Sequence, residues 1–362
     1  MLKVKKKWSL LAMIVIGAVL IASCTQDGET IYQADPKDKG STAPLVVVVY
    51  DPNALGDQGY NDLIYQGVEH AAERYGLRTM QLSPTTVEEG QQYLQLLVQG
   101  LAATQDTVRR LFIVAASSYD AYLRSHSNLL ASSPKTDLLY FETETPLEGK
   151  GSTFFIKYYG AMYEAGAISP ADAKSVLLVG ANPLVKSVAD AVQGFTDGFN
   201  ASPVAINDNE DRKLSTAWLS DKVSGGFTIP DTTALRLLVN HDWNLGRHLL
   251  VPICGGAMTN FRRIIEMFSL CDFVGIDCAA VSAYCNFSVI KHIDQAVYQC
   301  IEQWLSPGGM PKHQTFGLAD GFTGVEVHPY LNSYKEHFDT ILNADLLQRI
   351  HEEAIRKEAE HE

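Results

Sequence analysis

The stretch that decides the fold is Asp-Pro-Asn-Ala-Leu-Gly-Asp-Gln-Gly-Tyr-Asn, residues 51–61. It follows a continuous apolar run, residues 45–50, which is typical of a buried strand. It precedes residues 61–75, in which apolar side chains recur at helical spacing. A loop between a buried strand and a helix lies at the carboxyl edge of a parallel sheet, where α/β proteins bind ligands. Its two carboxylates, two glycines, aromatic ring and side-chain amides indicate recognition of a flat, polar small molecule.

The rest of the chain alternates short apolar runs with helical periods. Strands are expected at residues 45–50, 78–82, 111–115, 137–141, 153–157, 175–179, 213–217, 248–253, 272–276 and 315–318. Helices are expected at residues 61–75, 86–104, 119–130, 158–168, 184–200, 231–243, 257–268, 290–304 and 344–357. This alternation predicts parallel sheets built from βαβ units. Because the strands are too many for one comfortable sheet, we expect two α/β domains with a ligand cleft between them.

The first residues have the anatomy of a targeting segment. Lysines cluster in residues 3–7, an apolar run covers residues 8–20, and Ile-Ala-Ser-Cys follows at 21–24. Small residues before a cysteine resemble a bacterial lipobox, which predicts a signal peptide over 1–23 and lipidation of Cys24. The alternative is an uncleaved anchor with a chance cysteine. The polar segment 24–44 is interpreted as a flexible tether. The expected location is therefore the bacterial cell envelope, anchored to the lipid bilayer and facing the periplasm or the exterior.

Composition narrows the possible functions. The chain is 46% hydrophobic and 20% charged, as expected of a soluble globular body behind the targeting segment. Its net charge of −13 argues against binding to nucleic acid. No Cys-x-x-Cys pair occurs among the five cysteines after Cys24, so zinc and thioredoxin-like sites are disfavoured and buried free thiols are favoured. Neither a metal nor a cofactor is expected.

Catalytic templates do not occur in the sequence. The chain has no G-x-S-x-G, no H-E-x-x-H and no G-x-x-x-x-G-K-[ST] motif. Its ten histidines are scattered, and none forms a plausible ligand set with a neighbouring acid. We therefore expect no catalytic residues and a protein that is not an enzyme.

Several further motifs follow residues 51–61 in a fixed order. They are Gly-Phe-Thr-Asp-Gly-Phe at 194–199, Pro-Ile-Cys-Gly-Gly at 252–256, Gly-Ile-Asp at 275–277, Ser-Val-Ile-Lys-His-Ile-Asp at 288–294 and Phe-Gly-Leu at 316–318. Together with Tyr60 and Asn61, they resemble the motifs of the basic membrane protein family, the nucleoside-binding lipoproteins of ABC-type uptake systems. The likeness runs from about residue 45 to residue 330.

That resemblance implies a type I periplasmic-binding-protein fold, with two doubly wound domains that the chain crosses three times. It implies a first domain of 45–157 plus 279–304 and a second domain of 158–278 plus 305–362. It also implies a nucleoside ligand, with a purine favoured, and a partner that is the membrane permease of an ABC transporter. No covalent step is expected, because such receptors work by hinge closure.

Nine residues are expected to bind the ligand: Asp51, Tyr60, Asn61, Glu142, Phe227, Gly255, Gly256, Asp277 and Lys291. Asp51 belongs to the opening loop. Glu142 stands nearest to an aspartate of the family at the end of a first-domain strand, and Phe227 resembles the family's second-domain aromatic residue. The two glycines allow the backbone to approach a ligand closely.

For several of these residues a plainer role competes with ligand binding. Tyr60 could stack on a ligand ring or pack on its own domain, Asn61 could read a base edge or cap a helix, and Phe227 could be a core residue. Asp277 alone could be a turn residue. Lys291 lies in an apolar run and needs a charge partner or a polar ligand. A carboxylate and an ammonium together suit the hydroxyls of a sugar.

Two alternatives to a nucleoside receptor remain open. One is a receptor of the same fold for another small solute, such as a sugar or a signalling molecule. The other is an exported nucleoside-processing enzyme, which the missing catalytic and metal-binding sets disfavour.

Overall fold

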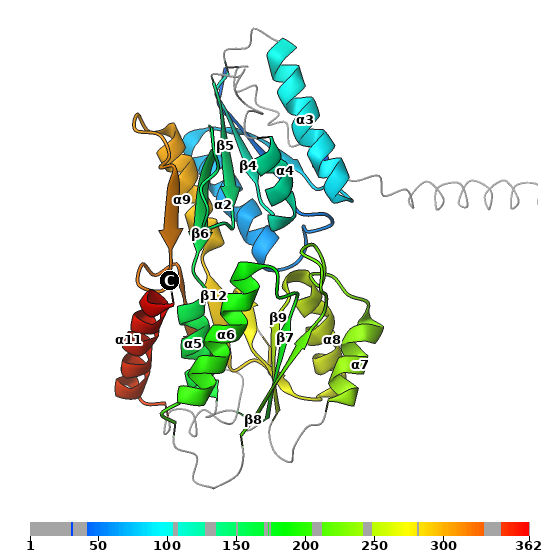
Figure 1. Cartoon of the computed structure of the whole chain (residues 1–362), viewed down its shortest axis with the longest axis vertical. Helices are drawn as coiled ribbons and strands as arrows, with labels where there is room; N and C mark the ends of the chain where they lie inside the picture. The colour runs from blue at the N-terminus through cyan, green and yellow to red at the C-terminus, as the bar shows by residue number, and fades with distance from the viewer. Residues whose placement is uncertain are drawn as a thin grey trace, which may run out of the picture.

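The computed structural model describes residues 30–31, 42–103, 108–126, 135–149, 151–169, 173, 175–204, 212–241, 248–280, 282–328 and 342–361. Two α/β domains lie one above the other (Figure 1). The signal segment, Cys24 and most of the predicted tether fall outside these ranges. Within them, no helix combines the length and the apolar character needed to cross a bilayer.

The first domain is built on a seven-stranded sheet of order β1-β3-β2-β4-β5-β6-β13. Its strands are β1 (Thr30–Ile31), β2 (Leu45–Val49), β3 (Arg78–Leu82), β4 (Arg110–Val114), β5 (Thr136–Phe141), β6 (Gly151–Ile156) and β13 (His313–Phe316). All neighbours are parallel except β1, which comes from the predicted tether and pairs antiparallel with β3. The central strands are buried on both faces, which explains their continuous apolar runs.

Helices cover both faces of this sheet. One core joins the sheet to α2 (Tyr60–Tyr75) and α9 (Ile293–Leu305), and a second core joins it to α3 (Val87–Ala103), the 3₁₀ turn η1 (Ser117–Tyr119) and α4 (Asp120–Ser125). Helix α2 ends at Gly76, which has a φ of 66° and closes the helix in the left-handed conformation that glycine adopts without strain. The loop at residues 51–61 connects β2 to α2, so it lies at the carboxyl edge of the sheet, as predicted.

The second domain contains two sheets. A parallel sheet of order β10-β9-β7-β8 is formed by β7 (Ser175–Gly180), β8 (Lys213–Trp218), β9 (His248–Ile253) and β10 (Asp272–Phe273). A second sheet of order β11-β12-β14 is formed by β11 (Gly275–Asp277), β12 (Phe287–Lys291) and β14 (Thr323–Val327). The helices are α5 (Tyr159–Ile168), α6 (Lys186–Ala201), α7 (Asp231–Asn240), the 3₁₀ turn η3 (Gly255–Ala257), α8 (Met258–Phe268) and α11 (Ala344–Glu360).

The Gly-Phe-Thr-Asp-Gly-Phe motif serves helix packing. A Cβ atom on Gly194 would lie 2.3 Å from the carbonyl oxygen of Tyr159, and one on Gly198 would lie 1.9 Å from that of Tyr163. Both carbonyls belong to α5, so the two glycines let α6 approach the backbone of that helix. Every residue of α5 is buried. This close contact makes α5 the central helix of the second domain.

The predicted division of the last third of the chain differs from the observed one. The resemblance implies that residues 279–304 belong to the first domain, yet only α9 joins the first-domain core, and β12 pairs with β11 and β14 in the second domain. The resemblance also implies that residues 305–362 belong to the second domain, yet β13 pairs in parallel with β6 of the first. The apolar run at 287–291 is a strand, and the helix begins only at Ile293. Lys291 therefore ends a strand and does not start a helix, because a short apolar run does not distinguish the two.

The chain crosses between the domains three times. The first crossing lies at residues 157–158, between β6 and α5; the second at His292, between β12 and α9; the third at residues 317–322, between β13 and β14. The crossings are hydrogen-bonded to one another. Lys157 N donates to Phe316 O at 2.8 Å, and His292 N donates to Phe322 O at 2.8 Å.

Candidate ligand-binding site

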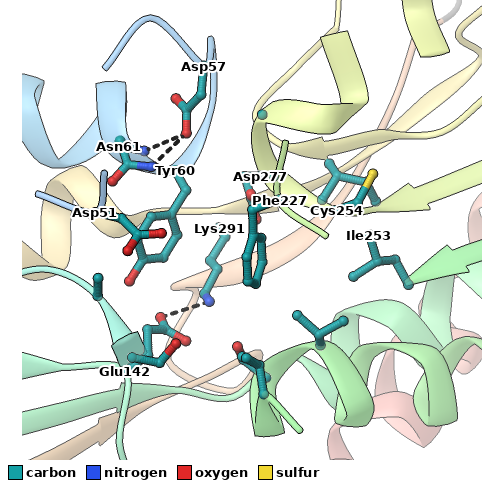
Figure 2. Close-up of a pocket in the computed structure, with 18 of the residues that line it drawn as sticks. Asp51, Asp57, Tyr60, Asn61, Glu142, Phe227, Ile253, Cys254, Asp277 and Lys291 are labelled. Atoms are coloured by element: carbon teal, nitrogen blue, oxygen red, sulfur yellow. Dashed lines mark hydrogen bonds and ion pairs between the residues drawn. The ribbon is translucent and has the colours of Figure 1, made fainter. Parts of the chain in front are cut away.

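All nine residues that the sequence singled out line one cavity between the domains (Figure 2). Its volume is about 110 Å³, several times the roughly 10–15 Å³ that a single water requires by the same measure. Asp51, Tyr60, Asn61 and Glu142 come from the first domain, while Phe227, Gly255, Gly256, Asp277 and Lys291 come from the second. The fold thus brings together residues that are as far as 240 positions apart in the chain.

The start of α2 is held by Asp57. Its Oδ1 accepts a hydrogen bond from Gly59 N at 2.9 Å, and its Oδ2 accepts from Asn61 N at 3.0 Å and from Asn61 Nδ2 at 2.9 Å. A carboxylate suits this place because the first N–H groups of a helix lack partners within the helix. The amide of Asn61 is therefore oriented by Asp57, and its buried Oδ1 has no hydrogen-bond partner among the described residues.

A buried ion pair joins the domains. The Nζ of Lys291 lies 2.8 Å from Oε1 of Glu142, and the two side chains are only 3% and 6% exposed. The ammonium also lies 5.5 Å from the centroid of the Tyr60 ring and 5.1 Å from that of Tyr158, within the range of cation–π attraction. The Oε2 of Glu142 is buried and has no hydrogen-bond partner in the described part of the chain. Lys291 thus has the charge partner that its apolar neighbours required.

Asp277 is held in an unusual conformation. Its φ of 67° is left-handed, a region that asparagine and aspartate tolerate better than other side chains. Its backbone N–H donates to the hydroxyl of Tyr158 at 3.2 Å. Burial raises the pKa of Asp277 to about 6, and the ammonium of Lys291 opposes that rise while Asp57 and Glu142 add to it. Its surroundings in the folded protein thus disfavour the ionised form of this carboxyl group.

The second domain supplies a largely apolar wall. Phe227 faces Tyr60 across the cavity in Figure 2, and the Lys291 side chain extends between them toward Glu142. Gly255 has a φ of 51°, and a Cβ there would lie 3.1 Å from Cδ1 of Phe227. The N–H of Ala257 donates to Phe227 O at 2.7 Å, which fixes the aromatic residue over the glycine turn. Further lining comes from Val185, Val188, Ile253, Cys254 and Ile276.

A second hollow adjoins the cavity at Asp51. This hollow, of about 160 Å³, shares Asp51, Asp57 and Phe227 with the cavity, and adds residues of the facing loops at 52–54 and 224–228. Ser118 Oγ donates to Asp51 Oδ1 at 2.6 Å. Burial raises the pKa of Asp51, and this bond opposes the rise. The two domains are also in direct contact at Cys278, whose thiol donates to Gln58 O at 3.0 Å.

Sequence reasoning missed several lining residues, of which Tyr158 matters most. This residue lies in the first crossing and contacts both Lys291 and Asp277 through its ring and hydroxyl. Its position directly after a predicted strand at a domain crossing was the signal that could have identified it. The apolar wall could not have been found in this way, because its valines and isoleucines look like ordinary core residues in the sequence.

The histidine, cysteine and acidic side chains of the described residues form no metal site, and their cysteines form no disulfide. Among the described residues, no group of three or more histidine, cysteine or acidic side chains is arranged to hold a metal ion. Five cysteines of the described part are free thiols, as the sequence favoured: Cys254, Cys271, Cys278, Cys285 and Cys300. Burial raises the pKa of the Cys254 thiol well above its usual range, so it stays protonated and is a poor nucleophile.

No protein-family model matches the sequence, and a comparison with curated proteins gives no match. Solved structures do resemble it. An ABC transporter solute-binding protein from Aeropyrum pernix K1 has a TM-score of 0.63 at 16% identity, with 88% of this chain and 86% of that chain covered. One from Conexibacter woesei has a TM-score of 0.60 at 13% identity, with coverage of 88% and 98%. The periplasmic component of an ABC-type sugar transport system from Hahella chejuensis has a TM-score of 0.55 at 14% identity, with coverage of 78% and 99%.

Likeness at these identities shows the fold. The two parallel-sheet domains, the three crossings and the cavity between the domains agree with it. The chain therefore has the type I periplasmic-binding-protein fold that its sequence predicted.

Proposed function

We propose that the protein is a solute-binding receptor of an ABC-type uptake system that binds a nucleoside, with a purine favoured, by closure of its two domains. The observation that carries this proposal is the cavity between the domains, with an aromatic residue on each wall and an amide, carboxylates and an ammonium around them. Closure of such a cleft excludes water and strengthens each polar contact to the ligand. The similarity to solved solute-binding proteins supports the receptor class.

The polar groups of the cavity point to the chemistry of the ligand. The buried acceptors Asn61 Oδ1 and Glu142 Oε2 lack partners among the described residues, and leaving such groups unpaired is costly. A ligand that donates hydrogen bonds would satisfy them. A purine nucleoside has amino or ring N–H donors on its base and hydroxyl donors on its ribose. Tyr60 and Phe227 would stack on the base, while Asp277 and Lys291 would hold the ribose hydroxyls.

A receptor for a sugar is the alternative within the same fold. Among the solved structures of similar fold, the Hahella protein is described as part of a sugar transport system, and one from Bacillus halodurans is described as a sugar-binding protein. Aromatic stacking and acceptor groups also suit a pyranose ring. An exported nucleoside-processing enzyme is a weaker alternative, because the cavity offers no metal-binding group and no activated nucleophile among its described residues.

One titration series tests the proposal against both alternatives. Calorimetry with adenosine, guanosine, uridine, ribose, glucose and galactose should give saturable binding for at least one nucleoside and none for the free sugars. Chromatography of the same mixtures should return the nucleosides unchanged. Binding of a sugar alone would contradict the nucleoside assignment, and release of free base at turnover rates would contradict the receptor class.

Replacing Tyr60 with alanine tests the stacking role. We expect binding of the best nucleoside to weaken by about 1–3 kcal/mol, the scale of base–aromatic stacking. Thermal stability should fall as well, because the ring packs on the core of the first domain beside Phe141 and the Lys291 ammonium loses one cation–π contact. Tyr65→Ala, on the same helix and outside the cavity, is the matched control. Equal affinities of wild type and Tyr60→Ala by calorimetry would refute the assignment.

Attachment to a membrane through Cys24 is also part of the proposal, as is transfer of the ligand to a permease. The basis for this is the apolar segment that follows the N-terminal lysines and ends in Ile-Ala-Ser-Cys. In a bacterial expression host, Cys24→Ala should abolish incorporation of labelled palmitate and leave the precursor unprocessed. Equal labelling of wild type and variant would show that the lipid is carried elsewhere or that the protein is not a lipoprotein.

A further inference from the structure

A buried carboxylate outside the cavity connects two of the three domain crossings. Glu358 lies in the last turn of α11 and is 6% exposed. Its Oε2 accepts a hydrogen bond from Gly160 N at 2.9 Å, just after the first crossing. Its Oε1 accepts one from Leu318 N at 2.8 Å, in the third crossing. One side chain from the end of the chain thus holds two backbone segments whose positions set the geometry of the domains.

The local chemistry explains why a carboxylate occupies this place. Gly160 is in the first turn of α5, where N–H groups have no partner within the helix, and Tyr158 at the helix start supplies no side-chain cap. A negative charge is favourable at such an end. Burial raises the pKa of Glu358, and the two N–H groups and Lys157 oppose that rise. A Cβ on Gly160 or Gly317 would lie within 2.6 Å of the carboxylate oxygens, so glycine at both positions leaves room for it.

The first crossing leads directly from Glu358 to the cavity. Tyr158 lies two residues before Gly160, lines the cavity, and is 3% exposed. Its hydroxyl accepts from the N–H of Asp277, and its ring lies 5.1 Å from the ammonium of Lys291. The third crossing leads to the same place, because β14 begins at Thr323, which pairs with Lys291. A shift of either crossing would therefore move groups that line the cavity.

We propose that Glu358 is a positioning residue for ligand binding, which fixes the first and third crossings and through them the placement of Tyr158, Asp277 and Lys291. In Figure 1, α11 lies along α5 with the chain end near the level of the crossings, which suits this role. The inference rests on the proposed function in one respect, since it assumes that a ligand is bound by closure of the two domains.

Hydrogen exchange in the ligand-free protein tests the positioning role without any ligand. The variants are Glu358→Ala and Glu358→Gln, with Glu352→Gln on the exposed face of α11 as the matched control. In Glu358→Ala, exchange should become faster at Gly160 and Leu318 and also at residues 57–61 and 277–278, which face the cavity or border it. Glu358→Gln keeps one carbonyl acceptor and should give an intermediate effect, which also covers the case that Glu358→Ala does not fold. Faster exchange confined to Gly160, Leu318 and α11 would mean that Glu358 only supports the fold, and would overturn the proposal.

Adenosine binding provides the second readout. We expect affinity for adenosine to fall about tenfold in Glu358→Ala and less in Glu358→Gln, in the usual range of coupling between separate sites. Glu352→Gln should bind as the wild type does. If wild-type protein binds no nucleoside while the exchange pattern appears as expected, the nucleoside assignment fails and the positioning role stands. If wild type binds adenosine and both Glu358 variants bind it equally well, the positioning role is wrong and the proposed function stands.

Discussion

Replacing Lys291 with methionine is expected to lower the free energy of unfolding by about 3–5 kcal/mol, the cost of leaving one member of a buried ion pair uncompensated. Glu142, whose side chain is 6% exposed, would lose the ammonium 2.8 Å away. Methionine keeps most of the apolar length of lysine, so little of the loss should come from packing. Denaturation in urea at pH 7.5 measures the change.

Two controls separate the buried pair from charge removal in general. The double variant Glu142→Gln, Lys291→Met should recover most of the lost stability, because removing both charges removes the desolvation cost as well. Arg263→Met breaks a pair with Asp231, whose side chains are 57% and 50% exposed, and should cost about 0.2–1 kcal/mol. If the free energy of unfolding of Lys291→Met lies within 1 kcal/mol of the wild-type value, the loss is on the order of that for a surface pair. That result would show that the ion pair does not form in solution.

Replacing Asp277 with asparagine is expected to stabilise the ligand-free protein near neutral pH. Burial raises the pKa of Asp277 from its ordinary value of 3.8 to about 6, so the folded state holds the proton more tightly than the unfolded state does. Stability then falls as the pH rises from about 4 to about 6, and the full cost remains above that window. At about 1.4 kcal/mol per pH unit the gain from asparagine approaches 3 kcal/mol as an upper bound.

The pH dependence of that gain is the measurement. Unfolding of wild type and Asp277→Asn should differ most at pH 7.5 and become similar near pH 4. Asparagine is the appropriate substitute because the φ of 67° is tolerated by asparagine, whereas alanine would add backbone strain. The exposed Asp221→Asn is the control and should show no such difference. A variant less stable than wild type at pH 7.5 would show that the ionised Asp277 contributes stability.

The same variant should bind its ligand more weakly. A carboxylate that accepts hydrogen bonds from two ribose hydroxyls contributes about 1.5–3 kcal/mol, the range for hydrogen bonds to a charged group. Asp277→Asn should therefore lose affinity for adenosine and much of its preference for adenosine over 2′-deoxyadenosine. If the ratio of the two dissociation constants equals that of wild type, Asp277 does not contact the sugar. Asp277 would then lower the stability of the protein and be required for binding, a combination that is common in functional sites.

Much of this architecture could be predicted because each element has a strong local signal. The apolar run before Asp51, the helical period of α2 and the glycine turn after β9 each indicate their own conformation. The carboxyl edge of a parallel sheet collects the loops that follow its strands, which is why Asp51, Tyr60 and Glu142 meet. Phe227 of the second domain was predicted from the resemblance to the family. Its backbone is held beside the cavity by the hydrogen bond from Ala257 N to its carbonyl oxygen.

The features that escaped prediction depend on contacts between distant residues. A run of five residues around Val289 fits a strand or a helix equally well, and only pairing with β11 and β14 makes it a strand. For that reason the observed division between the domains differs from the predicted one. The local sequence does not indicate the left-handed conformation of Asp277, nor does it indicate the contact of Glu358 with two crossings. Both depend on neighbours that are distant in the sequence.

The central claim is that the cavity holds an intact nucleoside, and identification of the compound carried by the protein tests it most directly. The mature protein is expressed in bacteria, purified without added ligand, and observed by native mass spectrometry, after which the bound compound is released by denaturation and identified. We predict a complex heavier than the chain by the mass of one nucleoside, and recovery of that nucleoside unchanged, with Tyr60→Ala recovering less. A free sugar, a free base or a compound without an aromatic ring would contradict this account.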